Sequence, residues 1–414
     1  MKIRSITYFC NPHWPLDESK LREAGDFLAQ AKAAYQTAGY EVQTTRLATI
    51  PFPRLISSGD FSRLRNITTK VVTTLVKEIE SIAEQIGVGY VSLGPALMDI
   101  PESYAVIPDA IAACQNVFFS GVMADQATGV SFAAIKACAD VIVKSAPIDP
   151  NGFANLRFAA LANVPAGAPF FPAAYHDGDD PMFAIATEAA DLAVDAFANA
   201  KTLDAGQRAL IAEIEKHGKA LAKVANTQLW NVNFSGIDFS LAPFPDDAHS
   251  LGNAVEQMGI PKIGLHGSLT AAALLTEAVD RADFPHTGFS GFMQPVLEDS
   301  VLAQRAAEGT LTIKDLLLYS AVCGTGLDTV PLPGDITKDQ LVPLLLDLSA
   351  LALRLDKPLT ARLMPVPGKK AGDATNFDFG FFANSKVMAL DAQPLKSSLA
   401  GDETFSIQSR KHNL

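Results

Sequence analysis

Short apolar segments typical of β-strands alternate with longer segments of helical periodicity along most of the 414-residue chain. Near the N-terminus, the strand-like segment RSITYF is followed by a helical pattern in which Leu21, Ala24, Leu28, Ala31 and Tyr35 recur. Similar pairs continue as far as LDTVPLP and ARLMPV, so about ten to twelve strands are expected. This alternation predicts an α/β protein with parallel strand pairing.

The middle of the chain carries three strand candidates close together, NLRFAALANV, PFFPAAYH and MFAIAT. After two helical patterns over residues 188–227, GIDFSL predicts a further strand. The segment IGLHGSLTAAALLTEA, residues 263–278, predicts a strand that passes directly into a helix with Ser268 as its N-cap.

No Pro/Gly/Ser-rich linker or run of charge divides the chain, so residues 1–366 are expected to form one large domain. In residues 367–414, DFGFFANSKVMAL suggests a hairpin, and a polar tail follows it. We assign this C-terminal part to the same domain.

Composition excludes several classes of function. With 45 acidic and 33 basic residues, a net charge of −12 and no cluster of Lys and Arg, the chain is not expected to bind nucleic acid. It has neither a signal segment nor a transmembrane pattern, so we expect a cytoplasmic protein without a membrane partner. The four cysteines are widely spaced and are expected to be reduced. A small-molecule substrate and a homo-oligomer are the expected partners.

The common cofactor motifs are absent. The chain has no G-x-x-x-x-G-K-[ST] loop, no G-x-G-x-x-G after a strand, no H-E-x-x-H and no G-x-S-x-G. Nucleotide cofactors are therefore not implied. A divalent metal ion stays open, because histidines and carboxylates can ligate one without these motifs.

Two histidines occupy positions where chemistry is common. His266 lies at the predicted strand end, where the backbone amides of Gly267 and Ser268 could bind an anion; the alternative is a histidine hydrogen-bonded into a turn. His176 follows the apolar PFFPAAY and precedes the acidic DGDD. It is a candidate general base with a raised pKa or a metal ligand, and the alternative is an ordinary surface histidine.

Charged residues inside apolar strands form a second group of candidates. Asp238 in GIDFSL needs either an open site or a cationic partner, because a buried unpaired charge is costly. Arg362 in TARLMPV is a possible partner for it, which would make both residues structural. Asp328 in LDTVPLP has the same two interpretations.

The remaining candidates lie near predicted helix ends. Cys323 enters a glycine-rich loop that leaves its thiol sterically accessible, so it is either a nucleophile or an inert buried cysteine. Glu298 and Asp299 are either catalytic or metal-binding acids, or first-turn acids that favour the helix dipole.

The segments IDFSLAPFPDDAHSLGNAVEQMGIPKIGLHGSLTAAALL, GFSGFMQPVLED and AVCGTGLDTVPLP resemble an uncharacterised bacterial and archaeal family often called PFL family proteins, the domain-of-unknown-function family numbered seven hundred and eleven. The likeness is specific over residues 116–390. It implies a single pyruvate formate-lyase-like α/β barrel of about ten strands wrapped by helices. The pattern of the family falls on Asn163, His176, Asp238, Ser240, Pro243, His266, Gly267, Glu298, Asp299, Cys323, Asp328 and Arg362.

The resemblance does not extend to radical chemistry, because the C-terminal part lacks the Arg-Val-x-Gly-Tyr type of loop that a glycyl radical enzyme needs. The chain also has Thr187 and Glu188 where the family carries a glycine-rich strand end, which removes an anion cradle and supplies another acid.

These observations favour an enzyme that performs non-redox acid/base chemistry, as a lyase or isomerase, on a small polar or anionic metabolite. The expected catalytic residues are His176, His266, Asp238, Cys323 and Asp328, with Asn163, Ser240, Gly267, Ser268 and Arg362 binding the substrate. One alternative is a metal-dependent hydrolase whose ligands come from His176, His266, Glu298 and Asp299. The other is a ligand-binding or structural barrel without catalytic activity.

Overall fold

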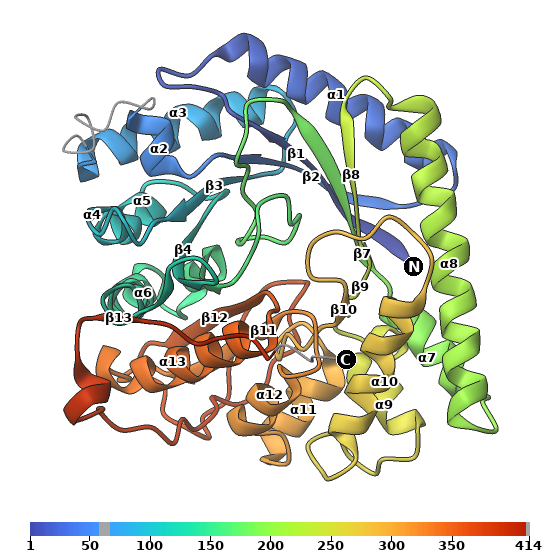
Figure 1. The fold of residues 1–414 in the computed structure, drawn as a ribbon. Coiled ribbons are helices and arrows are strands. Elements are labelled where there is room, and N and C mark those ends of the chain that lie inside the picture. The colour runs from blue at the N-terminus through green and yellow to red at the C-terminus, as the bar shows by residue number, and fades with distance from the viewer. Residues whose placement is uncertain (58–66, 411–414) are drawn as a thin grey trace.

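A mixed sheet of 11 strands forms the centre of the protein in the computed structural model, which describes residues 1–57 and 67–410 (Figure 1). Five neighbouring strands run parallel to one another, in the order β6 (Phe158–Ala162), β4 (Val117–Asp125), β3 (Tyr90–Ala96), β2 (Val42–Thr49) and β1 (Lys2–Cys10). The prediction of a large α/β fold with parallel strands is confirmed for this block.

Antiparallel junctions extend the block on both sides. β12 (Leu359–Val366) pairs antiparallel with β6 and carries β11 (Gly326–Pro333) as its parallel neighbour. On the other side, β7 (Met182–Glu188) pairs antiparallel with β1 and parallel with β8 (Asn233–Asp238). The short strand β5 (Gly129–Ser131) pairs with β4, and β13 (Thr404–Phe405) pairs with β5. The sheet is therefore mixed, not purely parallel.

The hydrogen-bonded path runs from β11 to β8 and does not by itself establish the closed barrel that the resemblance implies. A separate parallel pair, β9 (Ser240–Leu241) and β10 (Gly291–Phe292), follows β8. Two isolated parallel bridges, Ile237 with His286 and Pro295 with Asp328, lie near the two ends of the path.

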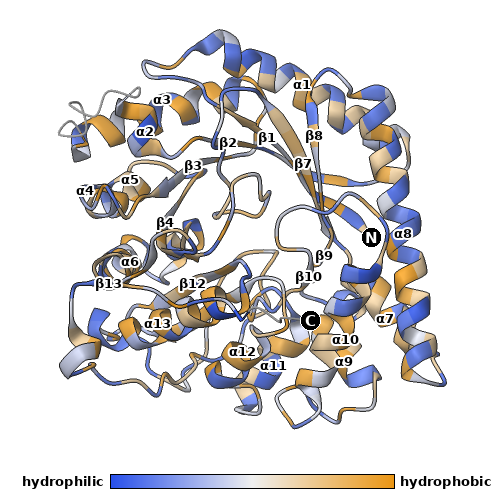
Figure 2. Cartoon of the chain, viewed as in Figure 1, coloured by the Kyte–Doolittle hydropathy of each residue, from blue (hydrophilic) through white to orange (hydrophobic). Residues whose placement is uncertain are grey.

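Helices surround the strands on their outer side (Figure 1). The helix α3 illustrates why they form, since Val72, Leu75, Val76 and Ile79 recur at helical spacing and are buried. Figure 2 shows hydrophobic and hydrophilic residues alternating in the same way along α8. The helices are α1 (Glu18–Thr37), α2 (Phe52–Ser57), α3 (Thr69–Gln85), α4 (Glu102–Ala105), α5 (Ile107–Ala112), α6 (Phe132–Ser145), α7 (Ala190–Ala198), α8 (Leu203–Gln228), α9 (Leu251–Gln257), α10 (Ser268–Arg281), α11 (Ser300–Glu308), α12 (Ile313–Tyr319) and α13 (Lys338–Leu355). Within residues 1–57 and 67–410, none of them has the length and hydropathy that crossing a bilayer requires.

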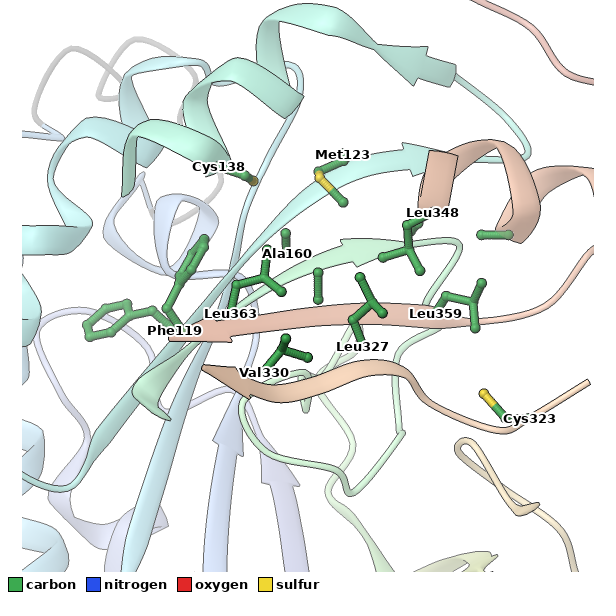
Figure 3. Close-up of a cluster of buried hydrophobic side chains, with 14 of the residues drawn as sticks. Phe119, Met123, Cys138, Ala160, Cys323, Leu327, Val330, Leu348, Leu359 and Leu363 are labelled. Atoms are coloured by element: carbon green, nitrogen blue, oxygen red, sulfur yellow. The ribbon is translucent and has the colours of Figure 1, made fainter. Parts of the chain in front are cut away.

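The main apolar core fills the space between the outer face of the sheet and these helices. Figure 3 shows Met123 of β4 and Leu363 of β12 beside Leu348 of α13, with Cys138 of α6 close by. Because side chains alternate along a strand, the residue next to Leu363, Arg362, lies on the opposite face of the sheet. The inner face of the sheet is where the polar side chains gather.

Two strand predictions in the middle of the chain are wrong. Residues 169–176 form no strand, because Pro169 and Pro172 lack the N–H groups that a sheet ladder needs. Instead, Phe171 and Ala174 pack into a small buried cluster with Phe9, Ala48, Phe118 and Ala184. The segment therefore packs against the inner face of the sheet.

Residues 263–265 also form no strand. They make a turn with one isolated bridge, and the N-cap of α10 is Gly267, at φ 106°. The hydroxyl of Ser268 donates to the Leu265 carbonyl and accepts from the Gly264 N–H, so it stabilises the turn instead of capping the helix.

The C-terminal part packs on the rest of the chain. Phe377 and Phe382 share a buried cluster with Leu297, Met364 and Val366. The expected hairpin is a loop closed by an antiparallel bridge between Ala374 and Lys386, without regular strands.

Candidate functional site

A cavity of about 130 Å³, partly open to solvent, lies against the inner face of the sheet. Its charged lining residues come from five strands and one loop: Arg4 of β1, Arg46 of β2, Asp238 of β8, Asp328 of β11, Arg362 of β12, and Glu298. Its aromatic lining residues are Tyr90, Phe118, Phe170, Phe171, Phe379 and Phe381. On β2, Gln43, Thr44 and Arg46 line the cavity, and the alternation of side chains along a strand places Thr44 and Arg46 on the same face.

A chain of buried ion pairs borders this cavity. The guanidinium of Arg362 donates to both carboxylate oxygens of Asp328, at 2.5 and 3.0 Å, and to Glu298 Oε1 at 2.8 Å. Arg4 donates to the other oxygen of Glu298 at 2.5 Å and to Glu188 at 2.6 Å. Glu298 therefore joins two arginines, and the chain Asp328, Arg362, Glu298, Arg4, Glu188 crosses the sheet between strands that are distant in sequence.

The surroundings of Asp328 change the pKa of its carboxyl group. Burial raises the pKa of its carboxyl group, the nearby Glu298 raises it further, and the pairing with Arg362 works in the opposite direction. The raised pKa makes the carboxyl group of Asp328 easier to protonate than that of an ordinary aspartate.

Arg46 lies at the same cavity without an acidic partner. Its Nε donates to Thr44 Oγ1 at 2.9 Å, and this is its only side-chain hydrogen bond among the described residues. The guanidinium carbon lies 5.0 Å from the ring centre of Phe171 and 5.8 Å from that of Tyr90. Burial, together with the positive charge of Arg4, lowers the pKa of Arg46 to about 9.

Asp238 lines the cavity but is not the partner of Arg362, which pairs with Asp328 and Glu298 instead. Its carboxylate accepts hydrogen bonds from the N–H groups of Phe289 and Ser290, both at 2.9 Å, and from the Ser240 hydroxyl at 2.5 Å. Burial raises its pKa against these hydrogen bonds. Asp238 therefore holds the loop before β10 in place.

His176 is buried at the carboxyl end of β2, where its backbone N–H donates to the Thr49 carbonyl. Its ring packs near Phe9, and it is not among the residues that line the cavity. Burial lowers its pKa, while Asp177 opposes the shift. The expectation of a raised pKa is therefore wrong, because the cost of burying the charged ring exceeds the effect of the nearby acids.

The structure does not bring His266 and Cys323 to this cavity. His266 and Gly267 are exposed on the turn before α10. Cys323 is buried at 1% exposure, with its sulfur near the Gly326 N–H at 3.4 Å, so the expectation of an accessible thiol is wrong. Asn163 donates to Asp356, also away from the cavity.

Asp299 is a capping residue. One carboxylate oxygen accepts from the N–H groups of Val301 and Leu302 at the start of α11, and the other accepts from Leu251 and Gly252 at the start of α9. Across the part of the chain that the structure describes, no group of three or more His, Cys, Asp or Glu side chains lies close enough to hold a metal ion. The ligand set expected from His176, His266, Glu298 and Asp299 is not assembled.

Arg4 and Arg46 were not among the site residues predicted from the sequence. Both are charged residues inside strand-like segments, KIRSITYF and VQTTRLAT, which is the same signal that identified Asp238 and Arg362. The aromatic residues had no such signal, because Phe170, Phe379 and Phe381 reach the cavity from segments outside the strands.

Comparison with known proteins agrees with the likeness seen in the sequence. The family profile described as "Uncharacterised ACR (DUF711)" matches residues 1–385. A UPF0210 protein of Pyrobaculum aerophilum is 39% identical over 281 residues, which are 65% of this chain and 61% of that protein, so the match spans less than two-thirds of the relative. A UPF0210 protein of Pyrobaculum islandicum is 32% identical, with 85% of this chain and 79% of the relative covered. One from Methanopyrus kandleri is 29% identical, with 88% and 82% covered. The chain therefore belongs to the uncharacterised DUF711 family, to which the resemblance had assigned it.

Proposed function

We propose that this protein is an enzyme that performs acid/base chemistry on a small anionic metabolite inside the cavity. The observation that carries the proposal is the chain of buried ion pairs beside a third arginine, Arg46, that has no acidic partner. A half-buried cation without a hydrogen-bonded acidic partner is costly, and an anionic substrate would supply that partner.

The roles follow from the contacts. Arg46 binds the anion, and Asp328 carries the proton, since its pKa is raised and it shares Arg362 with Glu298. When Asp328 takes up a proton, the hydrogen bonds of Arg362 shift toward Glu298. Lyase and isomerase chemistry both need such an anion binder and a proton carrier, and neither needs a nucleophile or a metal ion.

We also propose that the sheet closes into a pyruvate formate-lyase-like barrel through β9 and β10. Supporting this, Ile237 bridges to His286, β9 pairs with β10, and Pro295 bridges to Asp328 of β11. An experimental structure with continuous pairing from β8 to β11 would support closure, and solvent between β10 and β11 would contradict it.

A second candidate is a ligand-binding protein without catalytic activity. Its support is the full pairing of Asp328 and Glu298 with arginines, since carboxylates held in this way can be purely structural.

Solvent deuterium exchange separates these candidates. The wild-type protein is incubated in D₂O with a pooled extract of small metabolites, and deuterium at carbon is followed by mass spectrometry. We expect the wild type to label or convert at least one anionic metabolite. Asp328→Asn should lose this activity, whereas the exposed control Asp335→Asn should keep it. No labelling or conversion by the folded wild type would favour the non-catalytic candidate.

A further inference from the structure

Three arginines line the cavity, but only one is free to meet a ligand. Arg4 and Arg362 each contact two carboxylates. The two terminal nitrogens of Arg46 have no hydrogen bond to any residue that the structure describes, and only its Nε is occupied. A planar guanidinium with both terminal N–H groups free matches the two oxygens of a carboxylate.

We infer that the cavity binds a flat, largely apolar monocarboxylate whose carboxylate lies on the terminal nitrogens of Arg46 and whose body lies among the aromatic side chains. This inference rests on the proposed function, because it names the substrate class of the same site.

The charges around the cavity favour a single negative charge on the ligand. Arg46 is the one arginine of the lining without an acidic partner, and Arg4 and Arg362 are already paired with carboxylates, so no second cation is free for a second negative charge. A phosphate group needs several donors to compensate its dianion, whereas one bidentate arginine suffices for a carboxylate.

The aromatic side chains favour a flat body. Around Arg46, the rings of Tyr90 and Phe118 lie 5.4 Å apart, and those of Phe118 and Phe171 lie 5.6 Å apart, both edge to face. Phe170, which also lines the cavity, lies 5.4 Å from the guanidinium carbon of Arg362. Such surfaces favour stacking or edge contacts with a conjugated or aromatic group.

The volume bears on the size of the ligand. The cavity of about 130 Å³ far exceeds the roughly 10–15 Å³ that a single water needs, so it has room for a small molecule. Benzoate, a single ring with one carboxylate, is therefore a suitable probe.

The test measures binding of benzoate to the full-length protein by isothermal titration calorimetry near pH 7. Benzamide, phthalate and inorganic phosphate are titrated in parallel. We expect benzoate to bind at least about tenfold more tightly than any of the three, since each lacks the single flat carboxylate that the cavity fits.

Arg46→Gln should weaken benzoate binding at least about tenfold, and Arg46→Lys should give an intermediate loss, because it keeps the charge and loses the fork geometry. The exposed Arg208→Gln is the matched control and should bind as the wild type does. Circular dichroism establishes that each variant is folded, and the Lys variant serves as the test if the Gln variant does not fold.

Three outcomes overturn the inference: no binding of benzoate to the folded wild type, equal or tighter binding of benzamide, phthalate or phosphate, and benzoate binding that both Arg46 variants retain. The proposed function fails separately, if benzoate binding depends on Arg46 but the deuterium-exchange test finds no chemistry.

Discussion

The cavity on the inner face of the sheet and the hollow at the carboxyl ends of the parallel strands are both lined by several charged side chains. They differ in how far these side chains are buried and paired. In the cavity of about 130 Å³, the buried Glu298 and Asp328 are paired with arginines, and Arg46 is the arginine of the lining that lacks an acidic partner. The strand-end hollow is larger, about 630 Å³, and its acids Asp99, Asp125, Asp177 and Asp179 face one arginine, Arg54. Acids beside water can stay charged without a partner, whereas buried acids need one. The chemistry of a pocket therefore depends more on the burial and pairing of its charged side chains than on their number.

Breaking the buried pairs should have the largest effect. Arg362→Met leaves two buried carboxylates, Asp328 and Glu298, without their shared cation, so we expect the free energy of unfolding to fall by about 3–5 kcal/mol. Urea denaturation measures this change. The matched control is Arg54→Met at the exposed hollow, with an expected change within about 0.5 kcal/mol. A loss below about 1 kcal/mol for Arg362→Met would show that the buried pairs are no more costly to break than surface ones.

The pH dependence of stability sharpens the comparison at His176, whose neighbours Tyr175 and Asp177 line the strand-end hollow. Its pKa is lowered from 6.5 by burial, so below that value the unfolded chain takes up a proton that the folded protein disfavours. Stability contributed by the neutral ring is therefore present above pH 6.5 and is lost as the pH falls from there toward the lowered pKa.

His176→Gln should flatten the fall in unfolding free energy between pH 7 and pH 5, by at most about 1.4 kcal/mol per pH unit. Denaturation curves at several pH values measure this slope. His266→Gln, at an exposed position, is the matched control. An unchanged slope in the His176 variant would mean that protonation of this ring does not oppose folding.

The smallest effect is expected at the rim of the strand-end hollow. Asp179 is exposed and accepts one hydrogen bond, from Asn11 at 2.8 Å, so Asp179→Ala should change the free energy of unfolding by no more than about 0.5 kcal/mol. Urea denaturation again provides the measurement. A loss of several kcal/mol would place this acid in the same class as the buried ones.

The fold could be predicted from sequence wherever a pattern reflects burial. β11 and β12 form where LDTVPLP and ARLMPV predict them, because most of their residues are apolar and nearly all of them are buried. The segment at 169–176 was misassigned because apolar composition alone does not distinguish a strand from a buried loop, and its prolines were given too little weight.

The candidate site could be predicted only in part. Asp238, Asp328 and Arg362 were identified because a charge inside an apolar strand needs a partner or a cavity, and all three line the same cavity. Their pairing could not be read from sequence, since Arg362 had several acids to choose from and strand order decides which is near. His266 was selected for its place beside an expected strand, and that strand is a turn.

The cavity is also completed late during synthesis of the chain. Arg4, in the first strand, contacts Glu298, and its guanidinium carbon lies 5.3 Å from the ring centre of Phe381. During synthesis from the N-terminus, Arg4 and Arg46 therefore leave the ribosome long before the carboxylates and rings that enclose them. A nascent chain interrupted before residue 381 would carry Arg46, which we propose binds the anion, without a finished pocket, so binding of the proposed ligand would depend on completed synthesis as well as on folding.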